Sequence, residues 1–447
     1  MVFFTVIINM KKHQWNAAQV LSLGFASLIV LGTLLLLMPF SVTAPISLPE
    51  ALFTATSAVC VTGLTVLDTS SAFTAAGQAI ILLLIQVGGL GFMLFATFLL
   101  KALGRRISLK SRMLISESAG ADGIAATWRD MLRMARVTLA VEGVGALLLL
   151  AAFVPRFGWA TGAWYAVFHS VSAFCNAGFD LLGKNGGMAI FHGSAYMTLV
   201  LSLLIIFGGI GYAVLTDTVR QHFSFSRMQL HTRLVLIATG ALLLVGFVLF
   251  LLFEGNYTGT GILDALFQSV TTRTAGFSMI DQGELTDGSK LIGIVLMFIG
   301  ASPASTGGGV KTTTVLMLLL VVVSTVKAQR DITVFGRRLS LTTVRTAVCI
   351  VMADLFLLLT ATLVMTVTEA GRGVSLIDLM YETASALFTV GLTASGTPHF
   401  TLAGRLLLVA LMYIGRVGPM TVMLLLSGSP KRESKGLNYP EEHILIG

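Results

Sequence analysis

The sequence predicts an all-α polytopic membrane protein, with four helix–pore-loop–helix repeats in a pseudo-fourfold arrangement around a single pore. Apolar residues make up 55% of the chain and charged residues only 11%, whereas soluble domains are about 25% charged. Long apolar runs recur along the chain, and most are long enough for the ~20 residues that a spanning helix needs. The runs are 20–38, 79–100, 138–154, 197–215, 234–253, 291–299, 315–323, 348–367 and 406–426.

Four short motifs, each ending one residue after a glycine, repeat between these runs. The four glycines are 115, 98 and 115 residues apart, and an internal repeat of this kind reflects a repeated structural unit. An aromatic residue begins the segment before each motif, and a serine lies six residues before three of the glycines. A bundle core could explain aromatics or serines alone, but not four matching copies. The aromatics are Phe53, Phe168, Phe267 and Tyr381, and the serines are Ser57, Ser172 and Ser385.

Each repeat is predicted to contain a long apolar helix, a short segment, a glycine motif and a second long helix. The short segments have about ten residues, too few to cross a membrane, so we expect re-entrant helices that protein buries. The predicted organisation is an N-terminal cytoplasmic segment (1–15), repeat 1 (16–104), a cytoplasmic linker (105–128), repeat 2 (129–219), repeat 3 (231–329), repeat 4 (343–427) and a cytoplasmic tail (428–447).

The glycine motifs predict a selectivity filter for a dehydrated cation. Backbone carbonyls replace the hydration shell of a cation such as potassium, and glycine allows the dihedral angles that turn successive carbonyls toward one axis. The last motif, Thr-Val-Gly-Leu, is nearly the carbonyl-presenting run of a potassium filter. The predicted filter residues are Val61, Thr62, Gly63, Leu64, Asn176, Ala177, Gly178, Phe179, Thr274, Ala275, Gly276, Phe277, Thr389, Val390, Gly391 and Leu392.

The third repeat contains a predicted gate. Residues 290–327 number 38, too many for one crossing, and their middle part, 300–314, is small, polar and helix-breaking. A phosphate-binding loop is excluded because Val310 separates the last glycine from the lysine. Irregular backbone at membrane depth is tolerated where it lines a cavity, here below the filter. The predicted gate residues are Gly300, Ala301, Ser302, Pro303, Ala304, Ser305, Thr306, Gly307, Gly308, Gly309 and Lys311, together with Arg416.

Arg416 interrupts the apolar run 406–426. An arginine at the centre of a spanning helix costs ~2.5–3.5 kcal/mol on insertion scales, so it normally faces a cavity or a partner. We expect its partners to be carbonyls and hydroxyls of residues 302–314. Snorkelling to an interface is the alternative, but Arg416 is about ten residues from either end of its run. Glu142, Asp354 and Glu382 also lie in or near apolar runs, and we assign them to helix pairing or pore-helix support rather than to the site.

The charged residues predict the orientation in the membrane. Of the 29 Lys and Arg residues, 21 lie in five places that fall on one side if the runs alternate. These places are Lys11 with Lys12, 101–136, 220–233, 327–345 and 431–435. Basic short loops mark the cytoplasmic face, so the net charge of +8 reflects topology and not nucleic-acid binding. The opposite loops would attract cations through Asp68, Asp180, Glu254, Asp281, Glu284, Asp287 and Glu369.

Other classes of site find no support in the sequence. The three cysteines, Cys60, Cys175 and Cys349, form neither a disulfide framework nor a metal-ligand spacing, and we expect the first two to pack as small residues behind the filter. No nucleophile–base constellation appears, so an enzyme is not expected, nor an organic cofactor. The first apolar run lacks a small-residue cleavage site, so we expect no removed signal peptide.

The chain resembles the Trk/Ktr/HKT superfamily of potassium transporters, and most of all the KtrB type of membrane subunit in bacterial Ktr systems. The resemblance covers about residues 16–447. Besides the four filter motifs with their preceding residues, it rests on the segments 86–92, 207–211, 300–314 and 415–419. Asn176 and Arg273 occupy family-typical positions beside the filter.

The resemblance implies a function and partners. Glycine in all four filters favours potassium in this family, and serine in the first favours sodium, so Gly63 predicts potassium selectivity. The segment 300–314 would be the gating loop, and Arg416 would help to hold it closed. The protein would be a homodimer with one pore per subunit, surrounded by lipid in a bacterial inner membrane. A cytosolic KtrA-like ring of nucleotide-binding subunits would control opening, and the basic loops with the tail would provide docking contacts.

Two transport mechanisms fit this sequence. The first is channel-like potassium uptake driven by the membrane potential, with Na⁺ as a candidate activator. The second is a proton- or sodium-coupled potassium symporter of the same fold. Strict coupling should leave a titratable or sodium-ligating side chain near the filter, and none is obvious in 58–64, 172–179, 272–277 or 386–392.

Overall fold

The computed structural model describes residues 17–90, 128–255, 257–329, 331–335 and 337–426. These are almost entirely helical, apart from one hairpin in which β1 (Thr333–Val334) pairs antiparallel with β2 (Arg337–Arg338). The predicted segment 1–15, nearly all of the linker 105–128 and the tail 428–447 lie outside the described residues.

Long apolar helices form the outside of the protein. In the described part of the chain, three helices are long and apolar enough to span a membrane, or four if one bent pair is counted as a single span. At most 33% of the span window of each is buried, and side chains such as Leu147 and Leu363 are more than 60% exposed. An apolar outer surface of this kind requires lipid rather than water around it. The first long helices of the repeats are α2 (Ala17–Leu36), α8 (Trp128–Phe157), α12 (Leu230–Glu254) and α16 (Leu341–Thr368).

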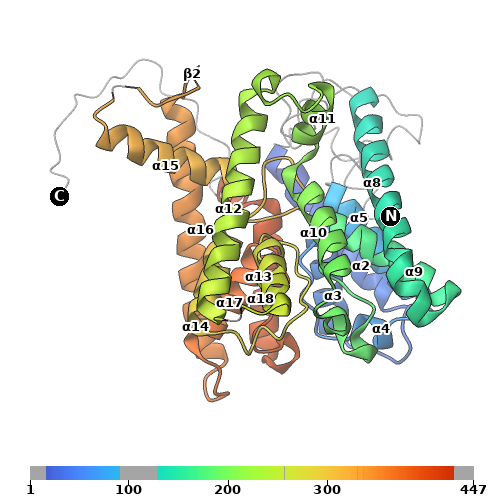
Figure 1. Ribbon diagram of the computed structural model, residues 1–447. Coiled ribbons are helices and arrows are strands. Elements are labelled where there is room, and N and C mark those ends of the chain that lie inside the picture. Colours follow the sequence, from blue (N-terminus) through green and yellow to red (C-terminus); the bar gives the residue numbers. More distant parts are fainter. Residues whose placement is uncertain (1–16, 91–127, 256, 330, 336, 427–447) are drawn as a thin grey trace.

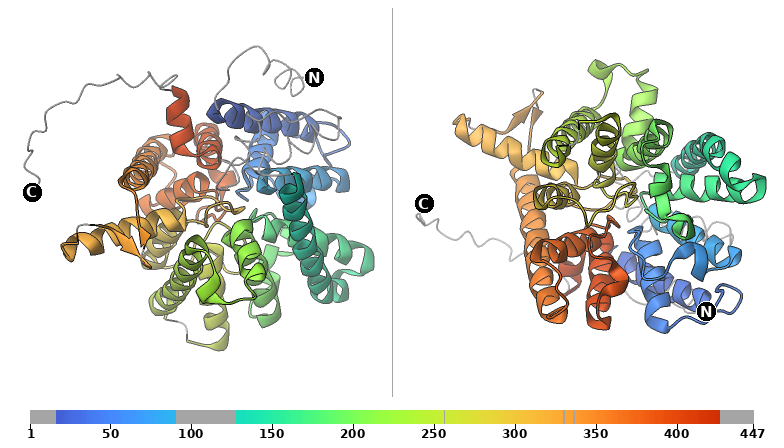
Figure 2. Two further views of the ribbon diagram at one scale, coloured as in Figure 1. Left: turned by 90° about the horizontal axis from the view of Figure 1, so that it is seen from above. Right: turned by 60° about the horizontal axis from the view of Figure 1, so that its bottom comes forward.

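A shorter helix packs against each of these long helices on the inner side. Hydroxyl side chains stabilise three of the N-termini, because Ser47, Thr258 and Ser375 occupy the N-cap positions. The aromatic residues predicted to begin these segments are at most 2% exposed and anchor the helices in the core. Seen from above, the parts of the chain follow one another around a common centre in sequence order (Figure 2). The shorter helices are α3 (Leu48–Cys60), α9 (Trp159–Phe174), α13 (Gly259–Thr271) and α17 (Leu376–Leu387).

The second long helices are less regular than the sequence predicts. The apolar run 197–215 is not one helix, since the chain bends by 96° at Gly211, which has φ +96°. The run 406–426 breaks at Gly418, with φ +93° and Pro419 directly after it. The prediction of one continuous helix is wrong in both places, because a left-handed glycine ends the helical hydrogen-bond ladder. The helices are α5 (Ala75–Leu90), α10 (Ala195–Ile210), α11 (Tyr212–Arg220), α18 (Leu402–Val417) and α19 (Pro419–Leu426).

The second half of the third repeat is interrupted, as its composition predicts. Helix α14 (Asp287–Phe298) ends where the segment 300–311 begins, and α15 (Thr312–Val326) then leaves the bundle sideways (Figure 1). The hairpin and α11 lie at the end of the molecule away from α3 and α17 (Figure 1). The hairpin belongs to the predicted basic stretch 327–345, and α11 ends at Arg220, where the stretch 220–233 begins. The remaining short elements are α4 (Thr69–Ala72) and the 3-10 helices Gly183–Asn185, Gly187–Phe191, Phe225–Arg227 and Thr397–His399.

Three glycines let the second long helices approach the ends of the shorter helices. Each faces a backbone carbonyl four residues before a motif glycine, so the same contact recurs in repeats 1, 2 and 4. An added Cβ would fall inside van der Waals contact, and small residues allow such close helix packing in membranes. A Cβ on Gly88, Gly208 or Gly415 would lie 2.1, 1.8 or 1.7 Å from the carbonyl oxygen of Val59, Phe174 or Leu387, respectively.

Replacing one of these glycines should destabilise the protein. Gly208→Ala places a methyl group against a backbone oxygen that cannot move alone, and overpacking of this kind costs about 1–3 kcal/mol. We expect a lower melting temperature for the detergent-solubilised protein. Gly143→Ala is the matched control, because a Cβ there meets no described atom within 4 Å. Equal melting temperatures for the two variants would contradict this account of the packing.

Candidate functional site

The four glycine motifs share one unusual backbone conformation. In each, the first and third residues have positive φ, while the residue between them does not. Left-handed conformation is uncommon for residues with a side chain, yet it recurs at the same position in every motif. Alternation of left- and right-handed residues turns successive carbonyls to the same side. The φ values are +56°, +58°, +67° and +50° for Val61, Asn176, Thr274 and Thr389, and +98°, +68°, +80° and +97° for Gly63, Gly178, Gly276 and Gly391.

The four motifs meet one another in a closed ring. Each glycine faces the carbonyl of the residue before the glycine in the next motif, and the fourth faces the first. Every one of these contacts is too close for a side chain, so glycine is required by both space and φ. A Cβ on Gly63, Gly178, Gly276 or Gly391 would lie 2.4, 2.8, 2.4 or 2.0 Å from the carbonyl oxygen of Ala177, Ala275, Val390 or Thr62, respectively.

Buried hydroxyls hold the motifs in this conformation. The backbone N–H of Gly63 donates to Ser57 Oγ, and that of Gly391 donates to Ser385 Oγ, both at 3.0 Å. In the second repeat Ser172 Oγ donates to the carbonyl of Phe179 at 2.8 Å. The third repeat uses Thr271, whose Oγ1 donates to the carbonyl of Phe277 at 2.6 Å. The sequence register missed Thr271 because it lies five residues before its glycine, not six.

The segment 300–311 lies directly against one end of the ring. An added Cβ on Gly307 would be 2.3 Å from Thr274 Oγ1, and one on Gly308 would be 2.2 Å from Thr389 Oγ1. The hydroxyl oxygens of these two threonines are buried and have no hydrogen-bond partner among the described residues. Unpaired buried oxygens at the end of a carbonyl-lined ring are suited to a cation or its water.

Backbone hydrogen bonds fix this segment to the second repeat. Ser302 N–H donates to the carbonyl of Gly209 at 3.0 Å, and Thr306 N–H donates to that of Gly208 at 3.3 Å. Thr306 Oγ1 donates to the carbonyl of Phe174 at 3.1 Å. Lys311 Nζ donates to the carbonyl of Gly307 at 2.8 Å within the segment. The segment is therefore held in place by hydrogen bonds to backbone carbonyls.

Arg416 joins this segment to two long helices. One guanidinium nitrogen donates to the carbonyl of Thr306 at 2.6 Å, and the other donates to the carbonyl of Gly88 in α5. The partner Thr306 lies in the range 302–314 expected from the sequence. Arg416 thus connects α18, the segment 300–311 and α5. Arg273 makes a related contact, since it donates to the carbonyl of Gly300 at 3.4 Å.

Buried charged residues also connect neighbouring repeats. Gln86 Nε2 donates to Glu142 Oε1 at 3.0 Å, which pairs α5 with α8, and Glu142 is 4% exposed. Lys290 and Asp378 form an ion pair of 2.8 Å between α14 and α17, which the sequence analysis missed. The sequence signal for this pair was Lys290 at the start of an apolar helix, together with Asp378 in the first turn of the short helix of the next repeat.

The cysteines behave as predicted. Cys60 and Cys175 are free and fully buried at the ends of their helices. Cys175 donates weakly to Glu142. Among the described residues no group of three or more His, Cys, Asp and Glu side chains is arranged to hold a metal ion.

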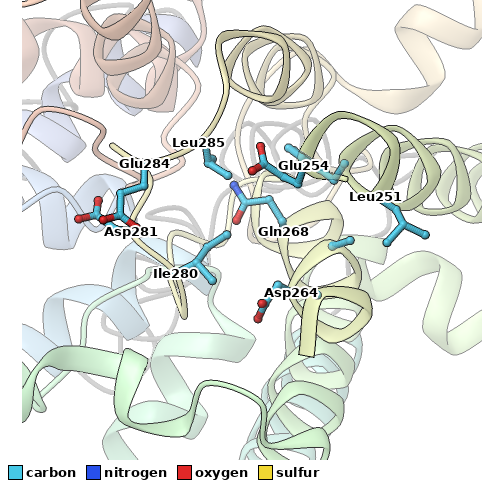
Figure 3. A pocket seen from close by; sticks show the side chains of 11 residues that line it. Leu251, Glu254, Asp264, Gln268, Ile280, Asp281, Glu284 and Leu285 are labelled. Carbon is cyan, nitrogen blue, oxygen red and sulfur yellow. The ribbon is translucent and has the colours of Figure 1, made fainter. Parts of the chain in front are cut away.

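Acidic side chains lie in the loops that follow the second and third motifs, among them Asp180, Asp281 and Glu284. Burial, with a smaller contribution from the nearby charge of Asp68, raises the pKa of Asp180 to about 6. A pocket of about 250 Å³ lies beside the third motif, between α12, α13 and residues 280–285. Figure 3 shows its carboxylates, Glu254, Asp264, Asp281 and Glu284, around the amide of Gln268.

Most carboxylates of this pocket have partners in the fold. Glu254 accepts from Thr286 N–H at 3.2 Å, Asp264 pairs with His192 at 2.9 Å, and Asp281 accepts from Gly283 N–H at 2.8 Å. They stabilise loops and, at the same time, give this face a negative potential that raises the local concentration of cations.

Known transport proteins resemble this chain over nearly its whole length. Residues 9–435 match the family described as TrkH: Cation transport protein. The chain is 37% identical to the Ktr system potassium uptake protein B of Bacillus subtilis, over 98% of both proteins. It is 38% identical to the potassium/sodium uptake protein NtpJ of Enterococcus hirae, over 99% of this chain and 100% of that protein.

A solved structure shows the same fold. The crystal structure of the potassium transporter TrkH from Vibrio parahaemolyticus superimposes with a TM-score of 0.72 and 20% identity, over 93% of this chain and 86% of the other. The family model covers nearly the whole chain. Two relatives are more than 35% identical to it over their full length. The chain belongs to the TrkH family of cation transport proteins and is a transporter rather than an enzyme.

Proposed function

We propose that this chain takes up potassium through one pore of its own, with the ring of four glycine motifs as the selectivity filter. The observation that carries the proposal is the closed ring of glycine–carbonyl contacts between successive motifs. Four equivalent backbones around one axis give the pseudo-fourfold symmetry that cation coordination by carbonyls requires. All sixteen residues of the motifs, Val61–Leu64 to Thr389–Leu392, contribute to this filter.

The short helices add an electrostatic contribution. Each ends no more than three residues before the first residue of its motif, so four helix C-termini point at the ring. A helix C-terminus carries about half a negative charge, which favours a cation without placing a carboxylate in the path. The acidic side chains beyond the ring extend this attraction to the outer surface.

The segment 300–311 is the proposed gate and Arg416 its latch. The segment lies against Thr274 and Thr389, at the end of the filter away from the acidic face. Arg416 holds it through the carbonyl of Thr306. Opening then requires that this hydrogen bond break and that the segment move toward α15. Since residues 300–309 are small or polar, they can rearrange without exposing a large apolar surface.

The control of this gate is proposed to come from a partner. The Bacillus subtilis relative is named as part of a Ktr system, which supports a second component, and a cytosolic KtrA-like ring of nucleotide-binding subunits fits that place. We further propose a homodimer in the bacterial inner membrane, with both termini in the cytoplasm. The basic stretches 220–233 and 327–345 lie together at the end away from the filter helices, where such a ring would dock (Figure 1).

A coupled symporter is the second candidate. The named potassium/sodium specificity of NtpJ supports it, as do two buried carboxylates near the filter, Glu142 and Glu382, at 4% and 0% exposure. The described hydrogen bonds of Glu142 and Glu382 go to groups outside the four motifs, so we favour the channel-like mechanism with Na⁺ as an activator. No organic cofactor is needed for either mechanism.

Reversal potentials in proteoliposomes test the mechanism. With a potassium gradient alone, the channel-like mechanism places the reversal potential of the purified protein at the potassium equilibrium potential. Changing the proton or sodium gradient at fixed potassium should leave that potential unchanged. Empty liposomes are the control. A reversal potential that follows the proton or sodium gradient would establish coupling instead.

Gly63→Ser tests the position of the filter. The serine side chain would clash with the Ala177 carbonyl and strain a backbone at φ +98°, so the ring should lose its fit to potassium. We expect the permeability ratio of K⁺ to Na⁺ to fall about tenfold, which corresponds to about 1.4 kcal/mol, while the protein still assembles. Gly240→Ser, where no described atom lies within 4 Å of a Cβ, should keep the ratio. An unchanged ratio in Gly63→Ser would place the filter elsewhere.

Arg416→Gln tests the latch. Loss of the charged hydrogen bond to Thr306 should release the segment and raise potassium flux in the absence of any regulatory partner. Deletion of 303–309 should raise it further. Arg405→Gln is the matched control in the same helix, because Arg405 donates to the carbonyls of Pro398 and Phe400, away from the segment 300–311. Basal flux that stays at the level of Arg405→Gln would rule out Arg416 as the latch.

A further inference from the structure

One position in the four filter helices is buried in every repeat but differs in chemistry. It is the residue directly after the anchoring aromatic, and its side chain lies behind the filter. The four residues are Thr54, His169, Gln268 and Glu382, which are 1%, 0%, 2% and 0% exposed. The position after the aromatic marks these four residues as equivalent in the sequence, and the structure adds that all four side chains are buried.

Two of these side chains hold the chain as it leaves the filter. His169 Nδ1 donates to the carbonyl of Tyr165 at 2.7 Å, so Nε2 accepts from the N–H of Leu181 at 3.4 Å. Gln268 forms a double amide contact with Gln282, at 2.5 and 3.2 Å. Each contact ties a filter helix to a residue three to six positions beyond its motif glycine.

Glu382 makes the densest contact of this kind. Its Oε1 accepts from the hydroxyl of Thr393, from the N–H of Ala394 at 3.1 Å and from the N–H of Ser395 at 3.4 Å. These donors lie two to four residues after Gly391. Hydrogen bonds to a carboxylate are about twice as strong as neutral ones, and burial removes competing water. By contrast, the hydroxyl of Thr54 donates to the Glu50 carbonyl of its own helix at 3.0 Å.

We propose that Glu382 is a positioning residue for ion selectivity, which fixes the carbonyls of Gly391 and Leu392 by holding residues 393–395. The inference rests on the proposed function and deepens it. Hydrogen bonds hold the fourth motif at both ends. Ser385 Oγ accepts from the N–H of Gly391, and Glu382 accepts from the N–H groups of Ala394 and Ser395. Without the bonds to Glu382, the peptide groups after Gly391 rotate and the ring no longer discriminates K⁺ from Na⁺ by size.

The test compares Glu382→Ala with Thr54→Ala, which removes an equally buried side chain at the equivalent position without a contact beyond the filter. The readout is the K⁺/Na⁺ permeability ratio from reversal potentials in proteoliposomes. We expect Glu382→Ala to lower the ratio about tenfold, comparable to the loss of one charged hydrogen bond. Thr54→Ala should retain the wild-type ratio. Glu382→Gln should restore most of it, because the amide oxygen still accepts where Oε1 does.

A second variant keeps the test valid if Glu382→Ala does not assemble. Thr393→Val removes one donor and leaves the carboxylate in place, and we expect the ratio to fall about threefold, as for a weaker bond. An unchanged K⁺/Na⁺ permeability ratio in Glu382→Ala would overturn the inference, as would an unchanged ratio in Thr393→Val if Glu382→Ala does not assemble. An equal fall of the ratio in Thr54→Ala would also overturn it. So would a ratio in Glu382→Gln as low as that in Glu382→Ala. Failure of the wild-type protein to conduct potassium would instead refute the proposed function.

Discussion

The contact between each motif glycine and a carbonyl of the next repeat is the constraint on which the rest of the structure depends. At distances that exclude even a methyl group, four stretches of backbone about 100 residues apart in sequence must arrive at one place with the same dihedral pattern. Because each contact joins two backbones, a side chain of the motifs cannot compensate for a misplaced motif. The surrounding helices therefore have to place the motifs accurately.

Two layers of interaction provide this accuracy. Inside, hydroxyls of Ser57, Ser172, Thr271 and Ser385 bind the motif backbones. Outside, glycines of the second long helices press directly on the ends of the filter helices. In a membrane the hydrophobic effect between helices is weak, so close packing and hydrogen bonds carry the association. The ion pair Lys290–Asp378 and the pair Gln86–Glu142 add links between repeats.

The third repeat lacks one of these layers and has the segment 300–311 in its place. Where repeats 1, 2 and 4 place a helical glycine against a filter helix, repeat 3 ends α14 at Phe298 and folds the segment 300–311 across the ring. The segment is held by backbone hydrogen bonds to Gly208 and Gly209 and by Arg416. Each of these bonds is individually modest, about 0.5–1.5 kcal/mol for neutral ones.

The sequence by itself determined the helical membrane class, the four motifs, the interruption of the third repeat and the partner region of Arg416. These follow from local chemistry: apolar run length, glycine position and a charge in an apolar helix. Only the tertiary structure decided the breaks at Gly211 and Gly418, the use of Thr271 in place of a serine, and the order of contacts in the ring. It also showed which of Thr54, His169, Gln268 and Glu382 contact the chain beyond their motif. These features depend on how segments 100 or more residues apart pack together, and no local pattern encodes that geometry.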